Sequence, residues 1–590
     1  MTLSMERSWG ARPQERLRLA ALRASWQWPA LAGVLAVAAA LNVIALGREG
    51  YANGYYAAAV RSMLQSWHNF FFVAFDPGGF VTIDKPPLGF WVQTASAKLF
   101  GFHGWSLLLP QAAAGVASAA VLFFIVRRRF GAIAGLLAAL ALALTPISVA
   151  TNRNNTIDSQ LVLTSLLAAW ATLKATERGS LRWLLLAMAL VGLGFNIKTL
   201  EAFLVLPALI LVYLVAAPVG WRRRILQLAA AGVVLLAASL AWVVTVDLIP
   251  ASQRPYVGSS RHNSELELAL GYNGLQRLLG GSNGAPKASG APSSASGTAT
   301  SATGGAAVST ASGTAAPASG VQASDGPTQA AGSASQANGG SPANQPPTGQ
   351  GGPDGGGPGG TGENGPVGIF RLLDTQLGGQ IGWLIPAALL GLVAAWRSGR
   401  RRRPDLRHQA LIAFGLWFLT CAAFFSKALF FHRYYLSMLA PAIAALFGIG
   451  AVALWQAYRR DRLRGWLLPL TLVATAAMQA YILRSYAGWR DWLTPLLVVP
   501  CLVTALVLTV ARLPWRLRLP ARALAGVAAV GVLALLIAPA VWAGETVRSN
   551  ASAGGIPSAG PQVRGAGGFG GPPAGGQSAR HDEGGQILRP

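Results

Sequence analysis

Residues 106–150 read SLLLPQAAAGVASAAVLFFIVRRRFGAIAGLLAALALALTPISVA, which is two long apolar runs divided by three consecutive arginines, Arg127 to Arg129. A helix rises 1.5 Å per residue, so a run of about 20 apolar residues is long enough to cross the hydrocarbon core of a bilayer. Three adjacent arginines between two such runs belong in the headgroup region or in water. This stretch therefore predicts two membrane-spanning helices joined by a short basic turn.

The same pattern recurs along the chain and predicts an all-α integral membrane protein. Of its 590 residues, 53% are hydrophobic and only 12% are charged, whereas a water-soluble domain averages about 25% charged residues. The net charge of +26 does not indicate a nucleic-acid partner, because the arginines fall in short clusters between apolar runs. We expect thirteen spans, at residues 29–47, 106–126, 131–150, 158–175, 182–197, 202–218, 225–248, 380–396, 409–425, 435–456, 466–484, 492–511 and 523–543.

The basic residues orient these predicted helices. If the basic N-terminal segment 1–28 is cytoplasmic, the short inner segments hold 28 of the 47 Lys and Arg residues, and 16 of the 21 Asp and Glu residues lie outside or at outer helix ends. This distribution satisfies the positive-inside rule. The first apolar run has no clear small-residue cleavage site, so we expect it to remain as an anchor. The sequence thus predicts a bacterial plasma membrane protein whose C-terminus and long loops are extracytoplasmic.

Two of the predicted outer segments, 48–105 and 249–379, are long. Within the second, residues 281–366 are almost wholly Gly, Ala, Ser, Pro, Thr, Gln and Asn, and the tail 544–590 has a similar composition. Such stretches have too few large apolar side chains to form a core, so we expect both to be disordered. The first outer segment predicts amphipathic helices on the membrane surface, because aromatic and apolar residues recur there at helical spacing: Tyr55, Tyr56, Met63 and Trp67.

Charged residues gather at the predicted outer helix ends rather than in the middle of the spans. Acids and bases that converge at one membrane level are typical of a functional site. Alternatively, each long side chain merely snorkels to the interface and anchors its own helix. The residues in question are Arg153, Asp158, Lys198, Glu201, Asp247, Lys427, His432 and Arg433.

The first outer segment also carries two acidic turns. Asp76 opens the sequence DPGG, which predicts a tight turn. Asp84 and Lys85 precede Pro86 and Pro87, and the prolines restrict the backbone and favour an extended approach to the next helix. A carboxylate presented rigidly beside an ammonium group suits a phosphate or a metal ion. The alternative is a surface turn with a local ion pair.

The same segment contains motifs that identify a family. The paired Tyr55 and Tyr56 are followed by Arg61-Ser62-Met63, by IDKPPLGFWVQ at residues 83–93 and by WSLLLPQ at residues 105–111. Together these motifs resemble glycosyltransferase family 39, a group of GT-C membrane glycosyltransferases that includes protein mannosyltransferases and the aminoarabinose transferases acting on lipid A. Within it the chain looks most like the bacterial mannosyltransferases of the YkcB type, on the stretches 81–93, 254–275, 377–389 and 430–450.

The resemblance implies a GT-C type bundle with a catalytic membrane module at residues 29–280 and further transmembrane helices at residues 367–543. It implies an inverting enzyme that moves a sugar, either a hexose such as mannose or a pentose, from a polyprenyl-phosphate donor on the outer leaflet. The acceptor would be a lipid, a glycan or a protein of the cell envelope. A lipid-linked donor fits this location because it arrives by lateral diffusion, whereas nucleotide sugars are absent outside.

The resemblance also implies roles for individual residues. In such enzymes a carboxylate deprotonates the acceptor and basic groups stabilise the departing phosphate. The donor phosphate would be bound by Lys85, with Arg153, Lys198, Arg261 or Arg433 as further candidates. Contacts to the substrates would come from Asn53, Tyr55, Tyr56, His432 and Tyr434. Asp84 stands where aminoarabinose transferases have an acid that helps to bind a divalent metal ion, for which His262 or His432 would be a second ligand.

One departure from the family pattern concerns the catalytic base. Many members carry an acidic pair just before the paired tyrosines, whereas this chain has Ala52 and Asn53 there. The base must then be another carboxylate, and the candidates are Asp76, Asp84 and Asp158. Asp158 opens the fourth predicted span on the outer side, in a segment that resembles an Arg-to-Asp motif of the family.

Two other classes of function are compatible with many spans. A transporter or flippase of lipid-linked sugars would also need basic sites for phosphate, but transporters usually show inverted repeats and polar groups at the bilayer midplane. The sequence shows neither. A scaffold protein would use the long outer loop to reach cell-wall partners, and the acids and bases at the outer helix ends argue against it.

Overall fold

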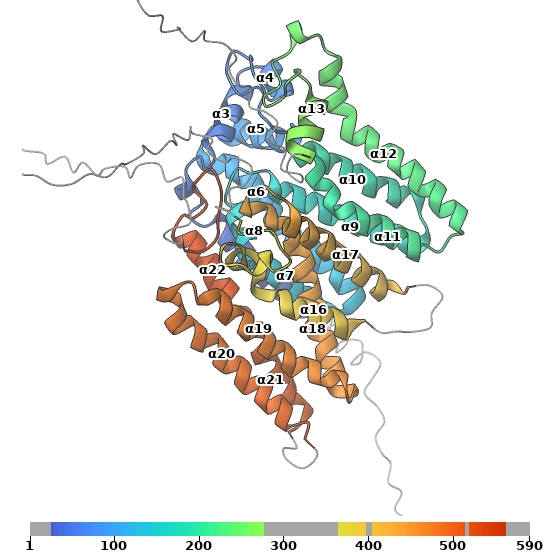
Figure 1. The fold of residues 1–590 in the computed structure, drawn as a ribbon, viewed down its shortest axis with the longest axis vertical. Helices are drawn as coiled ribbons and strands as arrows, with labels where there is room; N and C mark the ends of the chain where they lie inside the picture. Colours follow the sequence, from blue (N-terminus) through green and yellow to red (C-terminus); the bar gives the residue numbers. More distant parts are fainter. Residues whose placement is uncertain (1–24, 276–363, 397–403, 514–518, 562–590) are drawn as a thin grey trace, which may run out of the picture. The chain divides into compact units, whose positions relative to one another are not determined.

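The computed structural model describes residues 25–275, 364–396, 404–513 and 519–561 (Figure 1). Within these ranges the regular structure is helical, apart from two isolated β-bridges. An all-α architecture is therefore confirmed. The long helices are α2 (Gln27–Val43), α6 (Gly104–Phe130), α7 (Ala132–Ala143), α8 (Pro146–Asn152), α9 (Asp158–Arg178), α10 (Leu181–Lys198), α11 (Leu206–Ala216), α12 (Trp221–Leu248), α16 (Ile385–Ala395), α17 (Leu406–Lys427), α18 (Ala440–Arg460), α19 (Leu467–Leu483), α20 (Ala487–Val510), α21 (Ala521–Ala534) and α22 (Ile537–Arg548).

Ten helical stretches of the described residues are long and apolar enough to cross a membrane, or eleven if the bent pair α7 and α8 is one span. A multi-span membrane protein is thus confirmed, whereas the count of thirteen is not. The difference arises in two places. Residues 181–216 form one continuous helical stretch, in which the 3-10 helix η2 (Thr199–Val205) links α10 to α11, and α9 is not apolar enough to be counted.

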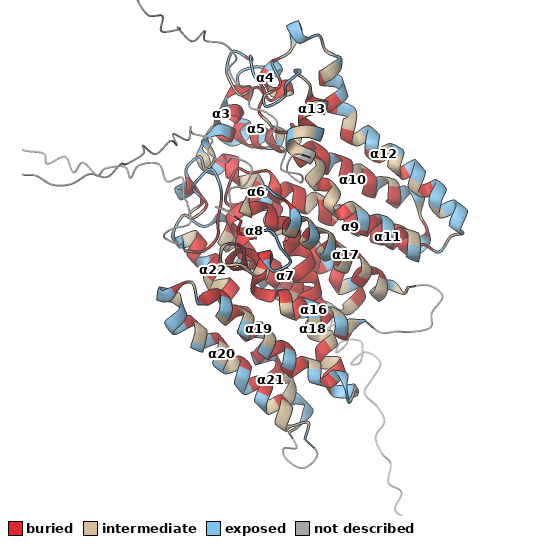
Figure 2. Ribbon diagram, in the orientation of Figure 1, coloured by how far each residue is buried: buried red, intermediate tan, exposed pale blue. Residues whose placement is uncertain are grey.

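The polarity of α9 follows from its position in the bundle. It packs against α6, α10, α11 and α17, and most of its residues are buried (Figure 2). A helix surrounded by other helices meets protein rather than lipid, so polar side chains such as Ser165 and Thr172 are tolerated along its length. Hydropathy alone therefore underestimates how well such a helix fits a membrane bundle.

Helix α18 lies at the centre of the C-terminal half, where it packs against α7, α16, α17 and α19. Small residues allow its close approach to its neighbours. A Cβ atom added at Gly450 would lie 2.5 Å from the Cα atom of Gly391 on α16, and one at Gly448 would lie 2.4 Å from the carbonyl oxygen of Ala134 on α7. Glycine at helix crossings lets backbones pack tightly without a large side chain between them.

The first outer segment folds as three short helices, α3 (Gly54–Met63), α4 (Trp67–Phe72) and α5 (Leu88–Phe100). Asn53 caps α3 by accepting a hydrogen bond from the backbone N–H of Tyr56 at 3.2 Å. Tyr56 and Met63 are buried, as the helical spacing predicts. Trp67 differs, because the chain breaks after α3 and Trp67 begins α4 with its side chain exposed.

The end of the described chain differs from the predicted disordered tail at 544–590. Helix α22 extends to Arg548, and residues 549–561 pack against the rest of the protein, with Ser552 and Ala559 buried. Residues 562–590 lie outside the described residues. The predicted disordered segment 281–366 also lies outside them, except for its last three residues.

The two ends of α9 differ in chemistry. Asp158 opens the helix, and Glu177 near its other end forms ion pairs with Arg128 at 2.7 Å and Arg129 at 3.0 Å. The helix has 21 residues and is therefore about 30 Å long, which matches the thickness of the hydrocarbon core. The arginine cluster and the Asp158 carboxylate are thus separated by about one membrane thickness.

Candidate active site

The Asp84-Lys85 turn is held rigidly by a distant segment. Lys85 is buried, and its ammonium group contacts the carboxylate of its neighbour Asp84. Asn273, in the single π-helical turn Gly271–Leu275, accepts from the Lys85 ammonium at 3.2 Å and donates to the Asp84 carbonyl oxygen at 2.8 Å. The two prolines that follow lead into α5 at Leu88. The turn is therefore fixed from both sides, as its sequence predicts.

A second lysine lies at the end of α10. The Lys198 ammonium donates to Asp158 at 2.5 Å and to Glu201 at 2.8 Å, and it lies 3.3 Å from the centre of the Tyr435 ring. The next residue, Thr199, has a φ of +33°, which L residues rarely adopt. This sharp change of direction ends α10 and allows Lys198 and Glu201 to meet.

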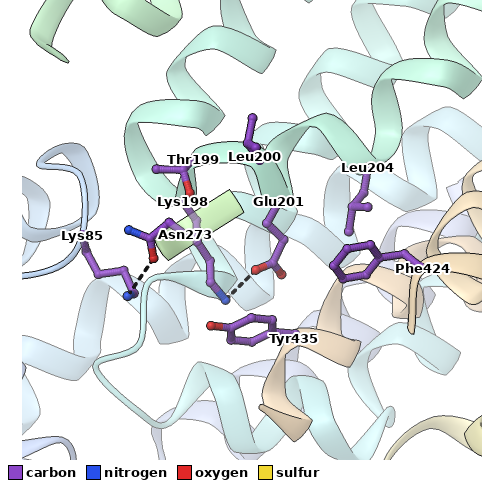
Figure 3. A pocket seen from close by; sticks show the side chains of 9 residues that line it. All are labelled: Lys85, Lys198, Thr199, Leu200, Glu201, Leu204, Asn273, Phe424 and Tyr435. Atoms are coloured by element: carbon purple, nitrogen blue, oxygen red, sulfur yellow. Dashed lines mark hydrogen bonds and ion pairs between the residues drawn. The ribbon is translucent and has the colours of Figure 1, made fainter. Parts of the chain in front are cut away.

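Both lysines line one small cavity of about 60 Å³ (Figure 3). Its polar lining comes from the two ammonium groups, Glu201 and Asn273, whereas Leu200, Leu204 and Phe424 form an apolar side. Figure 3 shows Lys85 and Lys198 on one side of this space and Phe424 with Leu204 on the other. The complete lining is Lys85, Lys198, Thr199, Leu200, Glu201, Leu204, Asn273, Phe424 and Tyr435.

Two of the predicted carboxylates lie beside these lysines but differ in exposure. The Asp84 side chain is 16% exposed, whereas that of Asp158 is 1% exposed. Oδ1 of Asp158 accepts from Lys198, and its Oδ2 atom is buried with no hydrogen-bond partner among the described residues. Asp84 is therefore the more exposed of the two carboxylates, and Asp158 is a buried partner of Lys198.

The paired tyrosines pack next to Asp84. The hydroxyl group of Tyr55 accepts a hydrogen bond from the Asp84 backbone N–H at 3.3 Å, and Tyr56 is buried against the ring of Phe90. Burial, with the nearby Asp84 charge as a smaller cause, raises the pKa of both tyrosines above the usual value. Both hydroxyls therefore keep their protons and remain hydrogen-bond donors at neutral pH.

Residues 432–435, which read HRYY, place two tyrosine rings beside Lys198. Tyr434 and Tyr435 are buried in the 3-10 helix η7 (Arg433–Leu439), with the Lys198 ammonium 4.9 Å and 3.3 Å from the centres of their rings. His432 stacks on Tyr434 at 5.5 Å. Arg433 is only partly buried and does not line the cavity. The faces of these aromatic rings attract the ammonium group and so stabilise the charge of a buried lysine.

Several other predicted site residues have structural contacts instead. Arg153 is fully buried and bonds Glu49 at 2.8 Å, and it also donates to the carbonyl oxygens of Leu41 and Ile44. The guanidinium therefore joins the segment before α9 to the end of α2. This arrangement does not support a donor phosphate at Arg153, because its bonds are directed to protein atoms.

The side chains of Asp76 and Asn53 accept hydrogen bonds from nearby backbone N–H groups. The Asp76 carboxylate accepts from the N–H groups of Phe80 and Val81 at 3.0 and 2.9 Å, which closes the DPGG turn. These bonds outweigh its partial burial and lower the pKa of Asp76. Asn53 caps α3 and exchanges two hydrogen bonds with Asn155. Neither residue lines the cavity.

The predicted metal ligands Asp84 and His262 have contacts with other residues. Asp84 is paired with Lys85, whereas His262 is 83% exposed and lies 3.4 Å from Glu267. Arg261, its neighbour, donates its backbone N–H to the same Glu267 side chain. In the part of the chain that the structure describes, no group of three or more His, Cys, Asp or Glu side chains could hold a metal ion. These contacts do not support a metal centre at Asp84 and His262.

The residues of the cavity that the sequence analysis did not predict as site residues include Asn273, Tyr435 and Glu201. Asn273 lies in the family-like stretch at 254–275, but it contacts Lys85 across 188 positions, and no local pattern marks that pairing. Tyr435 follows the predicted Tyr434 directly and is nearer to Lys198. Glu201 was noted as a charged residue at a helix end, without a role at the site.

Part of the chain matches a known family model. A model of the family described as dolichyl-phosphate-mannose-protein mannosyltransferase matches residues 84–242, a range that begins at Asp84 and includes Asp158 and Lys198. Among solved structures, ArnT from Cupriavidus metallidurans bound to undecaprenyl phosphate matches with a TM-score of 0.49 and 18% identity. The match covers 88% of this chain and 77% of ArnT.

Two proteins of Bacillus subtilis (strain 168) are similar over nearly the whole chain. "Putative mannosyltransferase YkcB" is 40% identical over 562 residues, which cover 90% of this chain and 76% of that protein. "Putative mannosyltransferase YycA" is 40% identical over 567 residues, which cover 91% of this chain and 79% of that protein. The protein therefore belongs to the family of membrane glycosyltransferases that includes YkcB and YycA, which confirms the family that the sequence motifs predicted.

Proposed function

We propose that this glycosyltransferase takes a sugar from a polyprenyl-phosphate donor and that the donor phosphate binds between Lys85 and Lys198. The observation that carries the proposal is the cavity in which two buried lysines face an apolar side formed by Leu200, Leu204 and Phe424. A lipid phosphate has a matching division between an anionic head and a hydrocarbon chain. The description of the family model, which names a dolichyl-phosphate sugar, agrees with such a donor.

The ion pairs of the two lysines suggest how donor binding prepares the reaction. Each lysine is neutralised by a carboxylate, Lys85 by Asp84 and Lys198 by Asp158 and Glu201. A phosphate that bonds Lys85 competes with Asp84 for the same ammonium group. Donor binding therefore releases the Asp84 carboxylate, which is the more exposed of the two aspartates, to act as a base.

In the proposed reaction Asp84 accepts the proton of an acceptor hydroxyl group. The acceptor oxygen attacks the anomeric carbon of the sugar and forms the new glycosidic bond, while the bond from that carbon to the phosphate oxygen breaks. The phosphate leaves with the electron pair, and Lys85 and Lys198 stabilise its charge. Attack opposite to the leaving group inverts the anomeric configuration. Asp158 and Glu201 position Lys198.

We also propose that the site faces the outside of a bacterial plasma membrane. The cavity lies at the Asp158 end of α9, and the arginine-rich end with Arg128 and Arg129 lies about 30 Å away. The positive-inside rule assigns the arginine end to the cytoplasm. A cytoplasmic N-terminus and an extracytoplasmic C-terminus follow from the same assignment.

The test uses purified protein in lipid nanodiscs with radiolabelled polyprenyl-phosphate mannose and a membrane fraction as the acceptor. Lys85→Ala and Lys198→Ala should lower transfer by about 10²-fold or more, since each removes a group that stabilises the leaving phosphate. Lys98→Ala is the matched control, because Lys98 is exposed on α5 close to Lys85 in sequence. Equal transfer by all four proteins would contradict the phosphate site. Movement of the donor across vesicles without a glycosidic product would instead favour a flippase.

A further inference from the structure

The segment that follows α22 is attached to the outer loops by side-chain amides. We call residues 552–560 the C-terminal strap. Asn154 donates through Nδ2 to the carbonyl oxygens of Ser552 at 2.7 Å and Gly554 at 2.9 Å. Asn53 donates to the carbonyl oxygen of Gly555 at 3.0 Å. The first half of the strap is thus bound by two residues that lie about 400 and 500 positions earlier in the chain.

The second half of the strap enters a tighter site. Gln380 on α15 (Thr375–Ile381) donates to the carbonyl oxygen of Ala559 at 3.0 Å and accepts from its N–H at 2.8 Å. The N–H of Gly560 donates to Thr546 at 2.9 Å. Residues 557–560, which read PSAG, are all buried. A side-chain amide that hydrogen-bonds both the N–H and the C=O of one residue makes the bonds that a neighbouring β-strand would make.

These hydrogen bonds are made to the backbone of the strap rather than to its side chains. Each of the six hydrogen bonds uses a backbone N–H or C=O group of the strap. Gly560 shows why the residues must be small. It has a φ of +76°, and a Cβ atom there would lie 2.1 Å from Nε1 of Trp542. The site therefore suits a chain of small residues with little further sequence preference.

The strap contacts two segments that lead to residues beside the proposed active site. Asn53 begins α3, which carries Tyr55 and Tyr56, and Asn154 lies four residues before Asp158. Asn155 links the two segments through its paired hydrogen bonds with Asn53 at 2.8 and 2.9 Å. A change in the position of the strap would therefore affect the backbone of both segments.

We propose that the surface around Asn53, Asn154, Gln380 and Thr546, which we call the groove, is a binding site for a peptide of small residues, that the strap fills it in cis, and that its occupancy positions α3 and the segment before α9 for transfer. The binding part is independent of the proposed function, and the positioning part rests on it. Asn53 and Asn154 are positioning residues in this scheme, because they act through the backbone that carries Tyr55, Tyr56 and Asp158.

The experiment separates binding from folding by cutting the strap after the protein has folded. A recognition sequence for a specific protease is inserted between Ser549 and Asn550, where Ser549 is exposed. The full chain is purified in nanodiscs and cleaved, and retention of the C-terminal fragment is followed by gel filtration. A fluorescent peptide of residues 549–561 then measures exchange into the groove. We expect the fragment to remain bound after cleavage and to exchange slowly with the peptide.

The matched variants are Gly560→Ala and Gly544→Ala. An added Cβ atom at Gly560 meets Trp542 in a left-handed backbone conformation, whereas Gly544 on α22 has no atom within 4 Å of that position. The left-handed conformation costs an L residue about 1–2 kcal/mol, so Gly560→Ala should release the fragment about tenfold faster. Gly544→Ala should retain it as the unmodified protein does. Immediate loss of the unmodified fragment, or equal release by both variants, would contradict the binding site.

Transfer assays on the cleaved protein test the positioning part. Washing out the fragment should lower kcat more than it changes the KM for the donor, and adding the free peptide should restore kcat. Unchanged transfer after the fragment has been lost would contradict positioning by the strap. If the intact protein shows no transfer at all, the proposed function fails, and fragment retention still decides whether the groove binds a peptide.

Discussion

The ammonium group of Lys198 donates to Oδ1 of Asp158 at 2.5 Å, although the two residues lie 40 positions apart on neighbouring helices. Asp158 is the first residue of α9 and Lys198 is the last residue of α10, so the pair joins two helix ends. Both side chains are at least 95% buried. A buried charge without a partner is costly, and the pair therefore fixes Lys198 in the cavity.

Replacement of Asp158 should affect stability and transfer separately. In Asp158→Asn, Lys198 keeps its ion pair with Glu201 but loses the shorter ion pair with Asp158. Loss of one partner of a buried ion pair costs about 3–5 kcal/mol of stability. We expect a lower thermal unfolding temperature and weaker transfer. The triple variant Asp158→Asn, Lys198→Met and Glu201→Gln removes all three charges of the group and should recover stability without recovering transfer. Transfer by the triple variant at the wild-type rate would contradict the role of Lys198.

Replacement of Asp84 should lower kcat with little effect on folding. Asp84→Asn preserves the size of the side chain but removes the proposed base, which typically contributes about 10²–10⁴-fold to a rate. The control is Asp76→Asn, because Asp76 closes a turn outside the cavity. Steady-state kinetics and circular dichroism of both variants provide the measurement. A kcat for Asp84→Asn within about twofold of the control would assign the base to another group.

Arg153 should prove structural rather than donor-binding. Its guanidinium bonds Glu49 and two carbonyl oxygens, and a lysine cannot reproduce that set of directed bonds. Arg153→Lys should therefore lower the unfolding temperature while the protein that remains folded binds the donor normally. Lys85→Ala should differ in binding, because the protein that remains folded should bind the donor weakly. Equilibrium binding of a radiolabelled donor, measured beside thermal unfolding, distinguishes the two. Loss of donor affinity in a stable Arg153→Lys protein would contradict this assignment.

Stability should depend on pH through Glu265, which lies outside the membrane spans at the start of α13 (Glu265–Leu270). Burial, with the Asp247 charge as a smaller cause, raises the pKa of Glu265 to about 8. The folded protein therefore keeps a proton that the unfolded chain loses near pH 4.5, and the stability from this proton falls as pH rises from about 4.5 to 8. The slope is at most about 1.4 kcal/mol per pH unit.

Thermal unfolding between pH 5 and 9 provides the measurement for Glu265. Glu265→Gln carries no titrating proton, so its unfolding temperature should fall less between pH 5 and 8 than that of the unmodified protein. Above pH 8 the two curves should run in parallel, because the folded and unfolded states then bind the same number of protons. Parallel curves over the whole range would show that Glu265 titrates normally.

Local sequence patterns predicted the membrane helices and the rigid Asp84-Lys85 turn. Hydropathy over about 20 residues reports whether a segment can lie in lipid, and the prolines act on their immediate neighbours, so neither needs the rest of the chain. The count of thirteen spans is not confirmed. Helix α9 is surrounded by other helices, and its polarity reflects those neighbours rather than lipid, so hydropathy does not decide whether it is a span.

The partners of the charged residues were not visible in the sequence. Arg153 and Lys198 both looked like phosphate ligands at outer helix ends, yet Arg153 bonds Glu49 and only Lys198 reaches the cavity. Asn273 meets Lys85 across 188 positions. Which charges pair depends on which helix ends the fold brings together, and hydropathy contains no such information.

The sequence by itself determined that the chain crosses a membrane many times, that it belongs to a glycosyltransferase family and that Asp84 and Lys85 form a fixed turn. Only the tertiary structure decided which carboxylate is exposed, which lysines share a cavity and that residues 552–560 bind to Asn53, Asn154 and Gln380. The physical reason is that Gly, Ser and Ala bury too little apolar surface to order a segment alone. The strap is ordered by amide donors from distant parts of the chain, and composition cannot reveal them.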